Sequence, residues 1–364
     1  MEKDKNRSLA KKVAVAGSLL LGSFALAGCE VAPPAALANV LDMGWPDPIT
    51  PEGVQMYNFW VWVWVAAWTI GIIMWALFLV AVFKWNAKAQ AKKTDDEFPK
   101  QLQYNVPLEL GLTIVPIIIV FVLFFFTVQA QTKTVALDKD PEVTVDVTAF
   151  QWNWKFGYAQ IGEELSPTGQ LYNGADEQRQ ALAEDTKYDA EEMPNANPIH
   201  GTSTGDMSYL NYNVIETTGT TDEIPVLVLP TETPIEFRLA SGDVSHAFWV
   251  PEFLFKRDVY AHPESNQQQR SFQIERIDRE GAFVGRCAEM CGTYHAMMNF
   301  EVRAVSPEDF RAYIQFRNDN PDATNAQALE SIGQDPYATT TRPFNSDRVG
   351  TRDGQNYTDP NQNV

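Results

Sequence analysis

Cysteine and basic side chains are both scarce in this chain of 364 residues. Three cysteines are too few for a disulfide framework to hold an exported protein of this length together. Lysine and arginine number 28 against 47 aspartates and glutamates, and the formal charge of −19 argues against nucleic acid as a partner. The acidity indicates either a partner with a basic surface, steered by long-range attraction, or solubility alone. No C-x-x-C-H motif is present, so the chain carries no covalently attached c-type haem.

The N-terminus has the pattern of a lipoprotein signal peptide. Five basic residues precede the apolar run from Val13 to Ala27, which is the arrangement of an export signal. The run ends in Leu26-Ala27-Gly28-Cys29, which resembles a bacterial lipobox, where the chain is cut before the cysteine and the thiol is acylated. We predict that residues 1–28 are removed, that Cys29 is lipidated and that an exported segment, 29–57, follows. An ordinary signal peptide or anchor with an incidental cysteine is the alternative.

Two long apolar stretches predict a transmembrane hairpin. No charged residue occurs from Phe59 to Phe83, and this run is long enough to cross about 30 Å of hydrocarbon as a helix. The second stretch carries a single acid, Glu109. We therefore predict transmembrane helices at 58–83 and 106–130.

The distribution of lysines orients this hairpin. Residues 30–57 contain no lysine or arginine, whereas the connection 84–105 carries Lys84, Lys88, Lys92, Lys93 and Lys100. By the positive-inside rule the connection is cytoplasmic, so everything after the second helix lies outside the cell membrane.

Short runs with alternating apolar residues predict an all-β sandwich at 131–305. The first run alternates Val143, Val145 and Val147 with polar residues. The other runs are Ile224–Leu229, Ile235–Leu239, Val244–Val250, Ser271–Ile277, Ala282–Arg286 and Met298–Val305. An acidic insert at 159–222 interrupts them, and a polar excursion of that length is usually functional or disordered. The segment 306–364 begins with a short helical pattern and continues from Asn318 as a polar tail, which we expect to be disordered unless it lies on a partner.

One loop concentrates metal-binding side chains in the pattern C-x3-C-x3-H-x2-M, formed by Cys287, Cys291, His295 and Met298. A second imidazole, His246, stands at the end of a predicted strand upstream. Soft sulfur combined with imidazole nitrogen favours copper. Two thiolates four positions apart could bridge two metal ions, each capped by one histidine, with a weak thioether on one side. Such a site suits electron transfer, whereas zinc would prefer four closed ligands.

Each of these residues also has a purely structural interpretation. Cys287 and Cys291 could form a disulfide in an oxidising compartment. The methionines could fill gaps in the core, and His246 could be a structural histidine beside Phe248 and Trp249. The joint spacing, together with the upstream histidine, favours the metal site.

These residues resemble the copper-binding subunit II of haem-copper cytochrome c oxidases. Two further segments share the resemblance, the aromatic run from Phe150 to Tyr158 and the run from Glu109 to Pro116. The resemblance implies a cupredoxin-like Greek-key sandwich behind a two-helix transmembrane hairpin. It also implies two coppers, bridged by Cys287 and Cys291, capped by His246 and His295, and completed by Met298 and the backbone carbonyl of Glu289.

The same resemblance implies roles for three more side chains. Trp152 would take the electron from cytochrome c, for passage through the copper centre to haem in the catalytic subunit, where oxygen reduction is coupled to proton pumping. Trp154 and Phe156 are expected in the core. The Glu289 side chain would point toward a magnesium ion shared with that subunit. Glu109 would stand at the mouth of a proton channel, or it is a helix N-terminal acid favoured by the dipole.

The lipobox and the long insert resemble the actinobacterial branch of this family, in which the donor cytochrome c is tethered to a bc complex. The expected partners are therefore the catalytic subunit I, other oxidase subunits, a separate c-type cytochrome and membrane lipid.

Three other protein classes compete with this interpretation. A quinol oxidase subunit of similar fold would lack the copper ligands. A thioredoxin-like copper chaperone also uses C-x3-C, but there proline usually follows the second cysteine, whereas Gly292 follows here, and the chain lacks alternating βα patterns. The third is a lipoprotein stapled by one disulfide.

Overall fold

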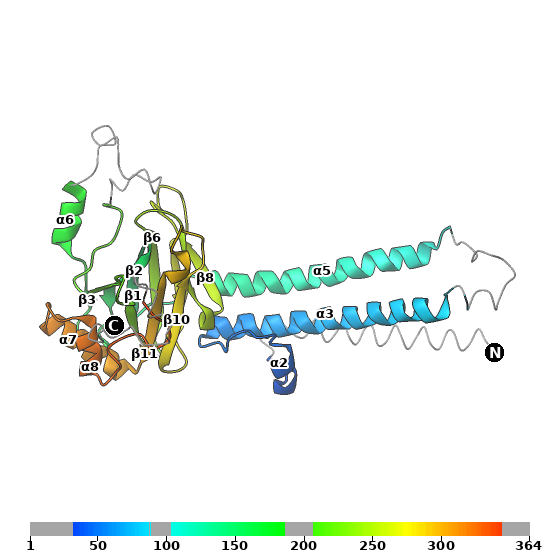
Figure 1. The fold of residues 1–364 in the computed structure, drawn as a ribbon, viewed down its shortest axis with the longest axis horizontal. Coiled ribbons are helices and arrows are strands. Elements are labelled where there is room, and N and C mark those ends of the chain that lie inside the picture. The colour runs from blue at the N-terminus through cyan, green and yellow to red at the C-terminus, as the bar shows by residue number, and fades with distance from the viewer. Residues whose placement is uncertain (1–31, 87, 89–102, 186–206, 344–364) are drawn as a thin grey trace. The chain divides into compact units, whose positions relative to one another are not determined.

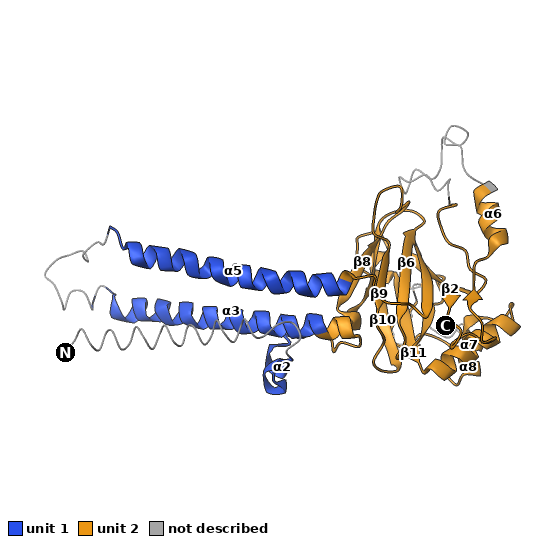
Figure 2. Ribbon diagram, turned by 180° about the vertical axis from the view of Figure 1, so that it is seen from behind, with its two compact units in different colours: residues 1–45, 55–134 blue, residues 46–54, 135–364 orange. Residues whose placement is uncertain are grey.

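The computed structural model describes residues 32–86, 88, 103–185 and 207–343. The predicted lipidation site, Cys29, lies outside these residues, as do the middle of the insert and the end of the tail. The chain divides into two compact units, one of residues 1–45 and 55–134 and the other of residues 46–54 and 135–364 (Figure 2).

The first unit contains the two predicted membrane helices, except for the first turn of α3 and the last residue of α5, and a short helix before them, α2 (Ala35–Leu41). Helix α3 (Pro51–Lys84) has 34 residues and helix α5 (Val106–Val135) has 30, and both are long and apolar enough to cross a membrane. Both therefore extend beyond the predicted spans 58–83 and 106–130. The α3 extension is at the N-terminal end, where Pro51 suits a first helical turn because its missing N–H needs no partner there.

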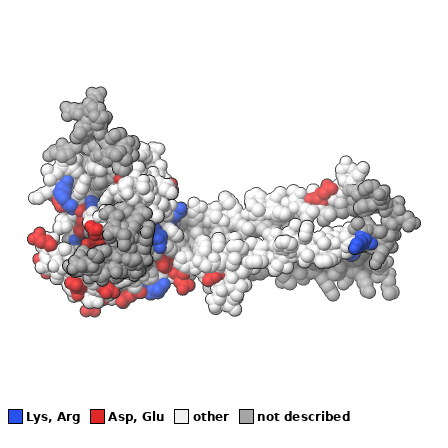
Figure 3. Space-filling view, in the orientation of Figure 1, with Lys and Arg blue, Asp and Glu red and all other residues white. Residues whose placement is uncertain are grey.

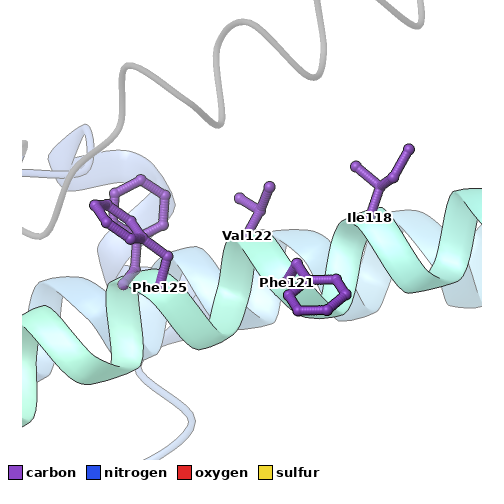
Figure 4. A pocket seen from close by; sticks show the side chains of 5 residues that line it. Ile118, Phe121, Val122 and Phe125 are labelled. Atoms are coloured by element: carbon purple, nitrogen blue, oxygen red, sulfur yellow. The ribbon is translucent and has the colours of Figure 1, made fainter.

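Between their ends, α3 and α5 show no charged residue on the face seen in Figure 3, and many of their exposed side chains are large and apolar. On α5, the side chains of Ile118, Phe121 and Phe125 are exposed and project away from the helix (Figure 4). In water such a surface would be costly, so it indicates lipid contact.

The second unit is a sandwich of a six-stranded and a five-stranded sheet (Figure 1). The first has the order β3-β2-β1-β6-β9, with β4 also pairing with β2, and the second has the order β5-β11-β10-β7-β8. The first sheet contains β1 (Val143–Phe150), β2 (Asn153–Ile161), β3 (Tyr172–Asn173), β4 (Glu216–Thr218), β6 (Ile235–Ser241) and β9 (Ser271–Ile274). The second contains β5 (Val226–Pro230), β7 (His246–Val250), β8 (Phe255–Val259), β10 (Gly281–Cys287) and β11 (Asn299–Val305).

Strands distant in the sequence are neighbours in both sheets, as in Greek-key sandwiches. β1 pairs in parallel with β6 and β11 pairs in parallel with β5, while the other pairings are antiparallel. The predicted hairpin followed by an all-β sandwich is therefore confirmed. Strands β2 and β8 were not expected, because β2 coincides with most of the aromatic run Phe150–Tyr158 and β8 is largely charged.

Aromatic side chains fill the space between the sheets. Trp154 and Phe156 are fully buried, as expected. The ring of Phe300 lies 5.2 Å from that of Trp154 and 4.8 Å from that of Phe248, between centroids. Such clusters provide a large buried apolar area and rigid packing. The core therefore extends to the end of the sandwich where His246 begins β7.

The described part of the insert is attached to the six-stranded sheet. Its helix α6 (Glu177–Asp185) is held through Arg179, whose guanidinium contacts the Glu216 carboxylate at 2.9 Å. The buried carboxylate of Asp146 on β1 accepts hydrogen bonds from Asn211 at 2.7 Å and from Asn213 at 3.0 Å. These contacts satisfy polar groups that burial would otherwise penalise, so the ends of the insert form part of the fold.

The expectation of a disordered tail is wrong for residues 320–343. After α7 (Pro307–Asp319), helix α8 (Asn325–Ser331) buries Ala328 and Leu329 against the core. The following residues close over a buried ion pair on β11, in which Arg303 Nη2 lies 2.5 Å from Glu301 Oε1. Glu301 Oε2 accepts hydrogen bonds from the backbone N–H groups of residues 339 and 340, and Arg303 donates to carbonyls of residues 335 and 337. This polar clamp, which composition does not reveal, holds the tail on its own chain.

Candidate metal centre

Five side-chain donors converge where β7, the β10–β11 loop and a 3-10 turn meet. His246 is the first residue of β7, Cys287 ends β10 and His295 opens the turn η2 (His295–Met297). The Sγ atoms of Cys287 and Cys291 lie 3.8 Å apart. Cys287 Sγ is 3.7 Å from His246 Nδ1, and Cys291 Sγ is 3.5 Å from His295 Nδ1 and 3.8 Å from Met298 Sδ. The predicted ligand side chains thus surround one point.

The sixth predicted ligand is a backbone carbonyl. Glu289 O lies 3.2 Å from Cys287 Sγ, while the Glu289 side chain is exposed. The carbonyl is therefore on the side of the sulfurs, and the carboxylate is available to a group outside this cluster.

The two cysteines face each other as free thiols. Their 3.8 Å separation is far longer than the roughly 2.05 Å of a disulfide bond. The hydrogen bond between the sulfurs lowers the pKa of the Cys287 thiol to about 3 and raises that of Cys291, because a second thiolate beside the first is opposed. A cation between the sulfurs would remove this opposition and favour two thiolates.

The imidazole of His246 is held by a carboxylate that was not among the predicted site residues. Asp243 Oδ1 lies 2.8 Å from His246 Nε2, so Nε2 carries a hydrogen, and Nδ1 faces Cys287 Sγ at 3.7 Å. Burial lowers the pKa of His246, but the hydrogen bonds to Asp243 and Cys287 outweigh it and raise the pKa. Burial raises the pKa of Asp243, but its bonds with His246 and the Gln151 N–H lower it overall. This carboxylate–histidine arrangement is typical of metal sites.

The turn between β1 and β2 contacts the same cluster. The Trp152 indole Nε1 donates to the Cys291 carbonyl at 3.0 Å, and Gln151 Nε2 donates to it at 2.6 Å. The rings of Trp152 and Tyr294 meet edge to face, 4.9 Å between centroids. Gly292 has φ +115°, and a Cβ there would lie 3.2 Å from Gln151 Nε2 and from Trp152 Cζ2, so the close approach requires glycine. Trp152 therefore reaches the ligand loop through one hydrogen bond.

The donor set fits copper better than other metals. Two cysteine sulfurs and a thioether are soft ligands, and imidazole nitrogen also suits copper, whereas a zinc site would use four closed ligands. Of these, His246, Cys287 and Cys291 have ligand atoms within 4.8 Å of one another. Gln151, Tyr294 and Asp243 were not predicted as site residues, because they reach the ligand residues only once the chain is folded. For Asp243 alone, its position three residues before His246 could have indicated the contact.

Glu109 is far from this cluster along the chain, in the first turn of α5. Its carboxylate accepts the Asn105 N–H at 3.1 Å, and Asn105 Oδ1 accepts the Leu108 N–H at 3.4 Å. This reciprocal pattern is a helix cap. The capping role is therefore observed, and the proton role stays a prediction.

The chain is similar to known proteins over nearly its whole length. Residues 206–305 match the family described as cytochrome c oxidase subunit II, periplasmic domain. Cytochrome c oxidase subunit 2 of Corynebacterium glutamicum is 68% identical over 357 residues, covering 98% of this chain and 99% of that protein. That of Corynebacterium efficiens is 66% identical, covering 99% and 100%. That of Mycobacterium tuberculosis is 47% identical, covering 93% and 90%.

Both bacterial genera are actinobacterial, as the lipobox and the insert indicated. Identity of this extent over both the helices and the sandwich shows that the chain belongs to the cytochrome c oxidase subunit II family and is an electron-transfer subunit of a haem-copper oxidase.

Proposed function

We propose that this subunit holds two copper ions and accepts electrons from a c-type cytochrome. Cys287 and Cys291 would bridge the ions, His246 and His295 would cap them, and Met298 with the Glu289 carbonyl would complete the set. When bound, the ions supply a centre that takes up and gives back one electron at a time. The observation that carries the proposal is the convergence of three sulfur and two Nδ1 atoms, each within 3.8 Å of another.

Trp152 is the proposed electron acceptor facing the donor. Its ring is partly exposed, and its N–H contacts the Cys291 carbonyl at 3.0 Å, so a short covalent and hydrogen-bonded path connects the indole to a ligand sulfur. Tyr294 and Gly292 keep the ring on this path, the first by edge-to-face packing and the second by leaving space. Trp154, two residues on, is buried in the core and cannot meet a donor.

The exposed face of the ligand loop is proposed to meet the catalytic subunit I. Glu289 and Met290 are both exposed there, and Met290 has 74% of its surface accessible. An exposed carboxylate beside an apolar side chain suits a subunit interface that shares a magnesium ion through Glu289, because magnesium prefers carboxylate oxygen.

The orientation and the lipid anchor are proposed from the sequence. The lysines of 84–105 would be cytoplasmic and the sandwich extracytoplasmic, on the side of the donor. Acylation of Cys29 would add a lipid anchor at that face. Glu109 would lie at the cytoplasmic end of α5, where a carboxylate can take up protons for the catalytic subunit.

The acidic insert 159–222 is proposed to help dock the donor, which we expect to be a cytochrome tethered to a bc complex in a supercomplex. Its described ends are attached to the sandwich through Asp146 and Glu216, so the acidic residues of the insert are tethered to this domain. Acidic groups near a docking site steer a basic partner at low ionic strength.

The copper assignment is tested with two variants of the purified oxidase. Cys287→Ser should lose the copper pair, its near-infrared absorption, its paramagnetic resonance signal and turnover, while the helices still insert. Trp152→Phe should keep the copper signals and lose electron delivery from cytochrome c. Thr293→Ser, an exposed change in the same loop, is the control for both. Normal copper content and turnover in Cys287→Ser would overturn the assignment.

A further inference from the structure

The short helix α2 and the turn after it form an apolar hook at the start of α3. The hook, residues 35–45, contains no charged residue before Asp42. In the first unit it projects sideways from α3 (Figures 1 and 2). Ala36 and Val40, four positions apart, lie on one side of the helix and are exposed, and Met43 follows them. Val40 is 69% exposed and Met43 is 48% exposed.

The hook is fixed to α3 by tryptophan. The indole of Trp60 donates to the Asp42 carbonyl at 3.0 Å, and its ring stacks on that of Trp45 at 4.3 Å between centroids. Trp60 also meets Trp64 edge to face at 5.6 Å. The turn is closed by bonds from the N–H groups of Gly44 and Trp45 to Asp42. The height of the hook along α3 is therefore set by Trp60.

That height coincides with a membrane–water interface. Trp60 and Trp85 bracket the uncharged part of α3; at 1.5 Å per residue they are about 37 Å apart, slightly more than the roughly 30 Å of hydrocarbon. Tryptophans at both ends of a span mark the headgroup levels. The hook therefore leaves α3 at one of these levels.

We propose that the hook is a lipid-binding element that lies in the leaflet where α3 begins, with Ala36, Val40 and Met43 against the acyl-chain boundary. Lipid is favoured as the occupant because Trp60 holds these exposed apolar side chains at the headgroup level of a helix whose own apolar side chains are exposed along the uncharged part of its length. Segments that lie in the interface bury apolar side chains and keep polar groups among the headgroups; here Asn39, on the same side of the helix as Ala36 and Val40, and Asp42 at its end would reach the headgroups. The proposal rests on α3 spanning the membrane and not on the copper assignment.

Collision measurements on a spin label test the proposal in the intact oxidase. Val40→Cys is labelled with a nitroxide, and the complex is reconstituted into vesicles of phosphatidylcholine and phosphatidylglycerol. Collisions with oxygen, which concentrates in lipid, are compared with those of a water-soluble nickel complex. Leu171→Cys, another exposed apolar position that lies in the sandwich unit, is the control, and complex without the substitution gives the background.

We expect oxygen collisions to exceed nickel collisions at Val40 and the order to reverse at Leu171. Nickel dominating at Val40 as well would mean that the hook lies in water and would overturn the proposal. Exclusion of both reagents at Val40 would mean that a neighbouring subunit covers it, and this would also overturn the proposal. Val40 is exposed, so its substitution leaves the core intact.

Discussion

Asp243→Asn should weaken copper binding without removing any ligand. The Asp243 carboxylate accepts three hydrogen bonds. Oδ1 accepts one from His246 Nε2 at 2.8 Å and one from the Val244 N–H at 2.7 Å, and Oδ2 accepts one from the Gln151 N–H at 2.7 Å. An asparagine has only one acceptor oxygen, so in either orientation its amide NH2 meets a donor. If the NH2 faces His246, the imidazole must move its hydrogen to Nδ1, which is the atom that faces Cys287.

The size of the effect follows from these contacts. Leaving one buried donor unpaired costs about 1–3 kcal/mol, and losing a partner that orients a metal-bound histidine typically lowers metal affinity about 10- to 100-fold. A hundredfold loss corresponds to about 2.8 kcal/mol, so the two ranges agree. We expect the affinity loss in this range, with the copper spectrum altered because one imidazole is reoriented.

The measurement is the chelator concentration that removes half of the copper from the purified oxidase at fixed pH. Asp222→Asn makes the same chemical change on an exposed loop and should leave that concentration unchanged. Thermal unfolding of the metal-depleted proteins separates copper affinity from fold stability. An unchanged chelator midpoint in Asp243→Asn, with Cys287→Ser copper-free beside it, would refute the orienting role of this carboxylate.

Three further outcomes are expected. Glu109→Gln keeps an acceptor for the Asn105 N–H, so it should slow turnover coupled to proton uptake without changing the copper signals; an unchanged rate would leave only the capping role. Glu301→Ala leaves Arg303 buried without its partner and should lower the free energy of unfolding by about 3–5 kcal/mol, measured by denaturant titration; a loss below about 1 kcal/mol would contradict the clamp. Replacing residues 186–206 by a short neutral linker should slow electron delivery at moderate salt while copper content stays normal. Electron-delivery rates equal to those of the unchanged protein at both low and moderate salt would argue against donor docking.

The sequence predicts best those parts of the structure that depend on a pattern of neighbouring residues. Uncharged runs long enough to span a membrane identify α3 and α5, and the ligand loop places four candidate donors within twelve positions, from Cys287 to Met298. The alternation of Ile235, Phe237 and Leu239 identifies β6, whose inward residues are buried. In each case the periodicity or the spacing is itself the physical requirement.

The parts that the sequence does not reveal depend on polar groups brought together from separate segments. Asp243 contacts Gln151 across 92 positions, and Glu301 contacts Thr339 across 38. Neither contact leaves a local pattern, because a single hydrogen bond needs no repeat. The same holds for the tail: its polar composition predicts disorder, but its backbone N–H and carbonyl groups satisfy a buried ion pair.

The positions of the ligands are set by backbone pairing as well as by side chains. The Cys287 N–H donates to the Met298 carbonyl at 3.0 Å, which joins the first and last residues of the ligand loop, and the Ala288 N–H donates to the Ala247 carbonyl at 3.0 Å, which joins this loop to the residue after His246. A backbone ladder does not change with the charge of a metal ion. Donors held in this way would move little when the proposed copper pair changes its oxidation state, so little reorganisation would oppose electron transfer. The β-sandwich therefore contributes to the chemistry directly, because the strand pairing that folds it also fixes the distance between the two loops that carry the ligands.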